Sequence, residues 1–174
     1  TFNNDGTKLF AISDNGAMNI HILSTPYDIS DATLVADDGI NWQTYKEPWG
    51  SSNTTMLPQT IRFNNDGTKM YLTEAVINTT DPQESVGVVQ YNLATPFVPS
   101  STTTVQVLNL RAQFSKTNKA IHAMNFDDDG TRMYVSAGNF NLETDHPHAV
   151  YELSIPFEIS SAKHVGTFNF VNAS

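Results

Sequence analysis

The segment Glu-Thr-Asp-His-Pro-His at residues 143–148 holds the densest group of potential metal ligands in the chain. Imidazole nitrogens beside a carboxylate suit zinc or another divalent cation. The proline between the two histidines favours an extended backbone, so both rings could point the same way. We therefore take Asp145, His146 and His148 as candidate metal ligands and a divalent cation as the only suggested cofactor. The alternative is a polar loop, and His122 is the only remote residue that could join the set.

A second candidate site is aromatic. Both tryptophans of the chain, Trp42 and Trp49, stand with Tyr45 in one long segment between strand-like runs. Exposed aromatic rings can stack on sugars or anchor a protein partner. They can equally fold back and cap the protein. Trp42, Tyr45 and Trp49 are the ligand-binding residues that the sequence predicts.

Other motifs set limits on the chemistry. Asn53, Asn78 and Asn172 begin Asn-X-Ser/Thr sequons, which matter only in a glycosylating secretory context. The sequence shows no nucleophile elbow, no phosphate-binding loop and no HExxH motif, so no catalytic residue is assigned. Catalytic carboxylates and histidines scattered over one face would leave no such motif, so the question of an enzyme stays open, with a non-enzyme favoured.

The 174 residues carry nine Lys and Arg against eighteen Asp and Glu, for a net charge of −9. This acidic balance argues against nucleic acid and anionic membrane surfaces as partners. The absence of cysteine removes disulfides and thiolate metal sites. The chain has no run of eighteen apolar residues, so membrane insertion is not predicted. Few lysines and segments rich in Thr, Asn and Ser favour an extracellular, virion-surface or cell-surface setting.

The elements that position these residues come from an internal repeat. The segment FNNDGTKLF at 2–10 returns as FNNDGTKMY at 63–71 and as FDDDGTRMY at 126–134. Asp-Gly between alternating apolar runs predicts a tight hairpin, since Gly and Asp tolerate positive φ. Each copy therefore predicts a strand, a turn and a second strand, and the aspartates are interpreted as turn formers.

A second motif keeps the same phase: LSTPYDIS at 23–30, LATPFVPS at 93–100 and LSIPFEIS at 153–160. Each follows one strand-like run and precedes another. The unit is thus four antiparallel strands in up-and-down order. Repetition at this spacing predicts an all-β fold of β-propeller blades. We place blade 1 at about 1–40, blade 2 at about 57–110 and blade 3 at about 119–171 of a single domain.

The Asp-Gly motif resembles the blade signature of the YVTN/TolB-like β-propeller superfamily. The second motif resembles an element of bacterial and phage-type propeller repeats of unknown function. The resemblance covers nearly the whole chain and implies a propeller fold without implying an activity, because propellers host many functions.

Alignment of the copies shows where the chain tolerates insertions. Long segments occur between the second and third strands, at 75–87 and 137–149, and between units, at 37–58 and 109–120. In an up-and-down blade these connections share one face, opposite the Asp-Gly turns. Asp37, Asp38, Asp81 and Glu84 add negative charge there. Inserted loops on a rigid repeat scaffold commonly carry function, so this face is the predicted binding surface.

Closure of the propeller is the remaining question. Thr1 and Phe2 correspond to the end of a first strand, so blade 1 lacks its inner strand, and fewer than three blades are present. We expect the chain to be a part of a longer propeller, to close a ring with other copies, or to build a fibre. The favoured function is a non-catalytic module for glycan or protein binding or for structural assembly. The alternatives are a propeller hydrolase or lactonase with a divalent metal near the axis, and a subunit of a self-assembling fibre.

Overall fold

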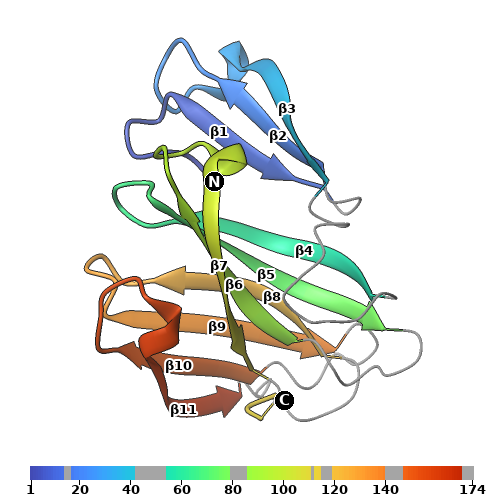
Figure 1. The fold of residues 1–174 in the computed structure, drawn as a ribbon, viewed down its shortest axis with the longest axis vertical. Helices are drawn as coiled ribbons and strands as arrows, with labels where there is room; N and C mark the ends of the chain where they lie inside the picture. The colour runs from blue at the N-terminus through green and yellow to red at the C-terminus, as the bar shows by residue number, and fades with distance from the viewer. Residues whose placement is uncertain are drawn as a thin grey trace, which may run out of the picture.

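The computed structural model describes residues 1–13, 17–41, 54–78, 86–110, 112–114, 119–139 and 147–169. These residues form an all-β structure of three antiparallel sheets, which follow one another along the long axis of the molecule (Figure 1). The prediction of an all-β fold built from antiparallel units is therefore confirmed. Among the described residues, no helix has the length and apolar character needed to cross a membrane.

Each sheet is a meander of strands that are consecutive in the chain. Sheet 1 contains β1 (Lys8–Ile12), β2 (Ala17–Ile22) and β3 (Thr33–Asn41). Sheet 2 contains β4 (Thr54–Phe63), β5 (Lys69–Asn78), β6 (Val86–Leu93) and β7 (Thr102–Asn109). Sheet 3 contains β8 (Lys119–Phe126), β9 (Arg132–Asn139), β10 (Pro147–Leu153) and β11 (Ala162–Asn169). Short 3₁₀ helices precede the last strand of each sheet: η1 (Ile29–Asp31), η2 (Pro99–Ser101) and η3 (Ile159–Ser161).

Sheet 1 has three strands where the other two sheets have four. Thr1 and Phe2 occupy the place of the end of a first strand. Phe2 forms a bridge with Leu9, and Phe10 N–H donates to the Thr1 carbonyl at 2.7 Å. The pairs Phe63 with Met70 and Phe126 with Met133 are the equivalents in the other sheets. Within the described residues, sheet 1 therefore has the end of a strand where sheets 2 and 3 have a full first strand, and the proposed blade boundaries stay a prediction.

The Asp-Gly turns have a different geometry from the one predicted. In sheet 2, Gly67 N–H donates to the Asn64 carbonyl at 3.1 Å, and only the glycine has a positive φ, of 73°. The Asp66 carboxylate instead accepts bonds from the Thr68 N–H at 2.9 Å and the Thr68 hydroxyl at 2.5 Å. Lys69 N–H donates to the Asn64 side chain at 2.9 Å. Asp is therefore selected as a hydrogen-bond acceptor, not for left-handed backbone geometry.

The two repeated motifs form one structural unit. Phe97 N–H, from the second motif, donates to the Gly67 carbonyl at 2.9 Å, and the Phe97 ring covers the glycine so closely that an added Cβ would lie 2.3 Å from a ring carbon. Phe97 itself has a φ of 56°. The same arrangement joins Tyr27 to Gly6 and Phe157 to Gly130. We call the second-motif segments at 23–30, 93–100 and 153–160 the connectors of sheets 1, 2 and 3. The turns and the connectors therefore lie at the same end of the sheets, as predicted.

Two apolar cores lie between the sheets. One contains Phe10, Met18, Met70 and Tyr91 among its buried members and joins sheets 1 and 2. The other contains Tyr71, Met124, Met133 and Tyr151 and joins sheets 2 and 3. In β5, Met70 and Leu72 point into one core and Tyr71 into the other, as the period of two requires.

Several strands run into the stretches predicted as inserted loops, and β3 and β5 are two of them. β3 includes Asp37 and Asp38, and β5 continues to Asn78, although both stretches were expected to be inserted loops. The ladder with β4 explains the second difference, because Thr54 pairs with Asn78 and Thr55 with Ile77. Pairing with a neighbouring strand thus extends β5 beyond its alternating sequence. Asp81 and Glu84 lie outside the described residues.

Candidate functional site

Most residues of the sequence-predicted sites lie outside the described part of the chain. They are the three aromatic residues Trp42, Tyr45 and Trp49, the two metal candidates Asp145 and His146, and the sequon residues Asn53 and Asn172. Asn78 is the last residue of β5, and only its backbone is described. These sites stay predictions.

His148 is the predicted metal ligand that the structure places. It lies in β10, with its Nδ1 atom 2.8 Å from the Ser136 hydroxyl of β9. Its ring stacks on Phe168 of β11 with centroids 5.3 Å apart. A serine–histidine contact is one part of a nucleophilic site. His122 lies in β8, where its carbonyl accepts from the Thr60 hydroxyl at 2.9 Å. Within the described ranges, no group of three or more His, Asp or Glu side chains could hold a metal ion.

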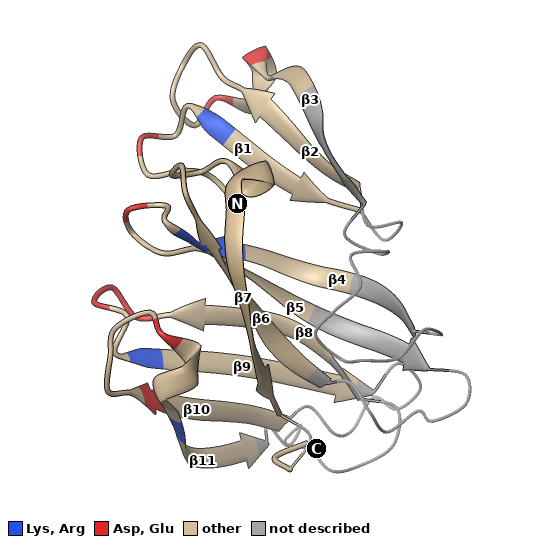
Figure 2. Ribbon diagram, viewed as in Figure 1, with Lys and Arg blue, Asp and Glu red and all other residues tan. Residues whose placement is uncertain are grey.

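The structure instead draws attention to how the sheets contact one another. The acidic residues coloured red in Figure 2 lie at the end of the sheets that carries the turns and connectors. Between sheets 2 and 3, the Lys69 ammonium of β5 contacts the Glu158 carboxylate at 2.7 Å, with both side chains largely buried. Glu158 belongs to the connector of sheet 3, so this ion pair fastens that connector onto sheet 2.

A buried glutamine completes this polar contact. Gln90 of β6 is fully buried, and its carbonyl accepts the Ile159 N–H at 3.0 Å. Its amide nitrogen lies 3.3 Å from each Glu158 oxygen. Burial acts to raise the pKa of Glu158, but the bonds from Lys69 and Gln90 outweigh it and hold the pKa below its usual value. Gln90 interrupts the apolar run of β6, which is the signal that could have identified it from sequence.

An aromatic contact lies beside this network. The buried Tyr71 hydroxyl of β5 donates to the Phe157 carbonyl at 2.5 Å, and the Tyr71 ring packs on Phe126 with centroids 4.7 Å apart. Burial raises the pKa of Tyr71 far above its ordinary range, so the hydroxyl stays protonated and acts as a permanent donor. Its role here is to hold the sheet 3 connector.

The contact between sheets 1 and 2 uses the same positions with apolar residues. Phe10 takes the place of Tyr71 and packs with Phe63, with ring centroids 4.6 Å apart. Ile20 stands in sheet 1 where Gln90 stands in sheet 2, since it pairs with Phe10 as Gln90 pairs with Tyr71. The connector residue that corresponds to Ile159 is Pro99, which is buried and has no N–H to satisfy. Gln90 therefore provides an acceptor where the connector residue, Ile159, has an N–H, and Ile20 provides none where the connector residue is Pro99.

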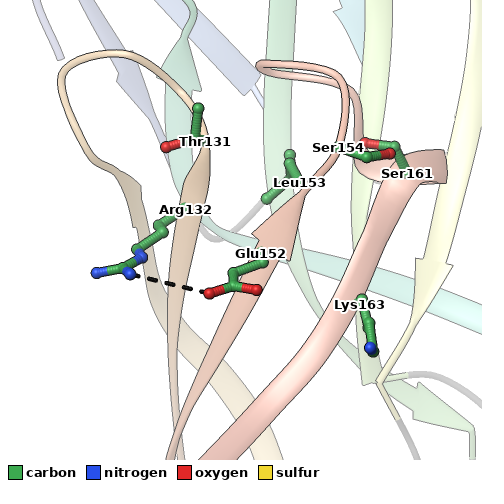
Figure 3. Close-up of a pocket in the computed structure, with 7 residues that line it drawn as sticks. All are labelled: Thr131, Arg132, Glu152, Leu153, Ser154, Ser161 and Lys163. Atoms are coloured by element: carbon green, nitrogen blue, oxygen red, sulfur yellow. Dashed lines mark ion pairs between the residues drawn. The ribbon is translucent and has the colours of Figure 1, made fainter.

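The outer face of sheet 3 carries a hollow of about 500 Å³ (Figure 3). Its lining comes from β9, β10, β11 and the connector between them: Thr131, Arg132, Glu152, Leu153, Ser154, Ser161 and Lys163. Arg132 and Glu152 are cross-strand neighbours in sheet 3, as Lys69 and Asn92 are in sheet 2, so Arg132 corresponds to Lys69 and Glu152 to Asn92. The hollow therefore lies where, on sheet 2, the next connector is seated. Arg132 contacts Glu152 at 3.8 Å, and both are exposed.

The connector of sheet 1 is the counterpart of this hollow. Ile29 is 66% exposed and Tyr27 is 56% exposed, whereas Ile159, which corresponds to Ile29 in sheet 3, is fully buried. Asp28 stands where Glu158 stands in sheet 3 and caps η1 by accepting from the Ser30 N–H at 2.9 Å. The groups that fasten the sheets inside the chain thus recur, exposed, on its two outer faces.

No family model matches the chain, and no curated protein matches it. Among solved structures, the chain resembles a protein from Bacteroides fragilis, assigned provisionally as a 6-phosphogluconolactonase, with 10% identity and a TM-score of 0.42. The likeness covers 95% of this chain and 55% of that protein, so the chain spans about half of its length. At this identity and TM-score, the likeness carries no inference about activity.

Proposed function

We propose that the three sheets are blades of a β-propeller-type scaffold and that the chain is a non-catalytic module for structural assembly through protein contacts. One observation carries the proposal. The outer faces of sheets 1 and 3 expose the counterparts of the groups that are buried at the contacts between sheets, Ile29 on one face and the hollow beside Arg132 on the other.

Physical chemistry favours covering these faces. Tyr27, Ile29, Leu34 and Val35 are all more than half exposed and all belong to the connector or last strand of sheet 1. Large apolar side chains gathered in one region of a surface are typical of contact sites, because their burial removes apolar area from water. The internal contacts show that a sheet of the same kind provides a fitting cover.

The further proposal that the inserted segments bind a glycan or a protein at a virion or cell surface rests on Trp42, Tyr45 and Trp49 and is open to test by their substitution. The proposed metal site rests on Asp145, His146 and His148. The ring of His148, which contacts Ser136, also stacks on Phe168. We give assembly precedence over hydrolysis because of the exposed contact faces of sheets 1 and 3.

The native mass in solution tests the proposal. Light scattering over a wide range of protein concentrations should give a mass above the 19.2 kDa of one chain. A mass of one chain at every concentration, up to the solubility limit, would contradict an assembly role. Binding and activity measurements on the inserted segments would then become the leading experiments.

A further inference from the structure

The two outer faces of the chain complement each other. The connector of sheet 1 presents an acidic residue and an exposed isoleucine, while the hollow on the outer face of sheet 3 is lined by two basic residues, Arg132 and Lys163, and one acidic residue, Glu152, so its cations exceed its carboxylates by one. We propose that two copies of residues 1–174 close head-to-tail into a dimer, in which the η1 connector of each copy occupies the hollow on sheet 3 of the other. This inference rests on the proposed assembly function and names its partner, a second copy.

Charge complementarity supports this pairing. Inside the chain, Glu158 of one sheet pairs with Lys69 of the preceding sheet. At the proposed contact, Asp28 corresponds to Glu158, and Arg132 corresponds to Lys69. The acidic side chain is one carbon shorter and the basic side chain is longer, so the combined reach is similar. Lys163 adds a second cation at the rim of the hollow (Figure 3).

The aromatic residues repeat in the same order. Inside the chain, Tyr71 packs on Phe126 and donates to the carbonyl of Phe157. The corresponding tyrosine on the outer face of sheet 3 is Tyr134, which is 41% exposed although Tyr71 is fully buried. The corresponding rings on the outer face of sheet 1 are Phe2 and Tyr27, which already pack edge-to-face at 5.4 Å. The second copy would therefore complete the cluster and cover Tyr134.

The number of sheets favours closure with two copies. A contact between two different faces of the same protein forms a ring if the rotations close and a filament if they do not. Closed propellers typically have about four to eight blades. Two copies of the three described sheets of residues 1–174 supply six, which is within that range, and three copies supply nine, which exceeds it. A closed dimer buries both outer faces of each copy.

One position differs from the internal contact and offers a sensitive test. Gln90 accepts the Ile159 N–H, but its counterpart in sheet 3 is Val150, which has no acceptor for the Ile29 N–H of a second copy. Seating Ile29 against Val150 is therefore less favourable than the internal arrangement. We expect Val150→Gln to supply the missing acceptor at both contacts of the dimer and to lower its dissociation constant about five- to hundredfold.

Charge reversal provides the decisive experiment. Sedimentation velocity of the unaltered chain should show a species of twice 19.2 kDa. Asp28→Lys alone, and Arg132→Glu with Lys163→Glu alone, should each raise the dissociation constant by at least about tenfold, because like charges then meet at both contacts. An equimolar mixture of the two variants should restore the dimer, since both of its contacts then join opposite charges.

The control is Asp128→Lys, which makes the same charge change at an exposed acidic residue in the turn of sheet 3 and should leave the mass unchanged. Circular dichroism should show that every variant keeps its β structure. Val98 occupies the position of Asp28 in sheet 2 and has no capping bond, so η1 does not need Asp28 to form.

The outcomes separate the two proposals. A dimer that ignores the charge reversals, or a mixture that stays monomeric while each variant is folded, overturns the head-to-tail contact but leaves assembly in place. An assembly that grows beyond two copies overturns the closed ring. A chain that is monomeric at every concentration overturns the dimer and the assembly function together.

Discussion

The glycine of the third turn provides the sharpest test of how the two motifs fasten each sheet. Gly130 has a φ of 72°, and a Cβ at this residue would lie 2.3 Å from carbon atoms of the Phe157 ring. Gly130→Ala therefore imposes two costs. The left-handed backbone disfavours an L-side chain by about 1–2 kcal/mol, and displacing a packed ring costs about 1–3 kcal/mol.

Together these costs should lower the free energy of unfolding by about 2–5 kcal/mol, which corresponds to a fall of roughly 4–20 °C in Tm for a chain of this size. Urea denaturation followed by far-ultraviolet circular dichroism measures the change through the midpoint and slope. Gly166→Ala is the matched control, because nothing lies within 4 Å of its added Cβ. That change should stabilise the strand by about 0.5–1 kcal/mol.

The ring contribution can be isolated with Phe157→Ala. In that background Gly130→Ala should cost only the backbone share, about 1–2 kcal/mol, because the ring is gone. An unchanged cost in the Phe157→Ala background would refute the close ring contact. A Gly130→Ala protein as stable as the Gly166→Ala control would refute the account of the turn itself.

Three further predictions concern the contact between sheets 2 and 3. Gln90→Ile should lower the free energy of unfolding by about 1–3 kcal/mol, because it leaves the buried Ile159 N–H without an acceptor. Adding Ile159→Pro should recover part of the loss. Chemical denaturation of the single and double variants measures the coupling energy between the two residues, and costs that simply add would count against the hydrogen bond. Tyr71→Phe should lower the free energy of unfolding by about 0.5–1.5 kcal/mol, because it removes the bond to the Phe157 carbonyl. Tyr151→Phe should be close to neutral, since the buried Tyr151 hydroxyl has no hydrogen-bond partner among the described residues. Equal losses of stability in thermal melts would argue that packing, not the hydrogen bond, matters. The folded-state pKa of Glu158 lies below its ordinary value, so the contribution of its ion pair to stability is present above about pH 4.5 and is lost as the pH falls through the lowered pKa. Glu158→Gln should therefore make stability less dependent on pH in the acid range. A stability profile that is the same in the variant would exclude this contribution of Glu158.

Strand order and turn positions were predictable from sequence, because both depend on local chemistry. Alternating apolar residues such as Met70 and Leu72 select strands, and the Asn-Asp-Gly-Thr side chains close a turn with bonds spanning at most five residues. The placement of turns and connectors at one end followed from the up-and-down order alone.

Contacts between distant residues were decided only by the tertiary structure. The Phe97 ring on Gly67, and Gln90 meeting Glu158 across 68 residues, depend on how connectors and sheets pack, which no local pattern encodes. The extension of β5 to Asn78 likewise depends on a partner strand, because backbone donors and acceptors extend a ladder wherever a neighbour lies within reach. The sequence by itself determined the repeating unit, and packing between units decided which of its residues meet.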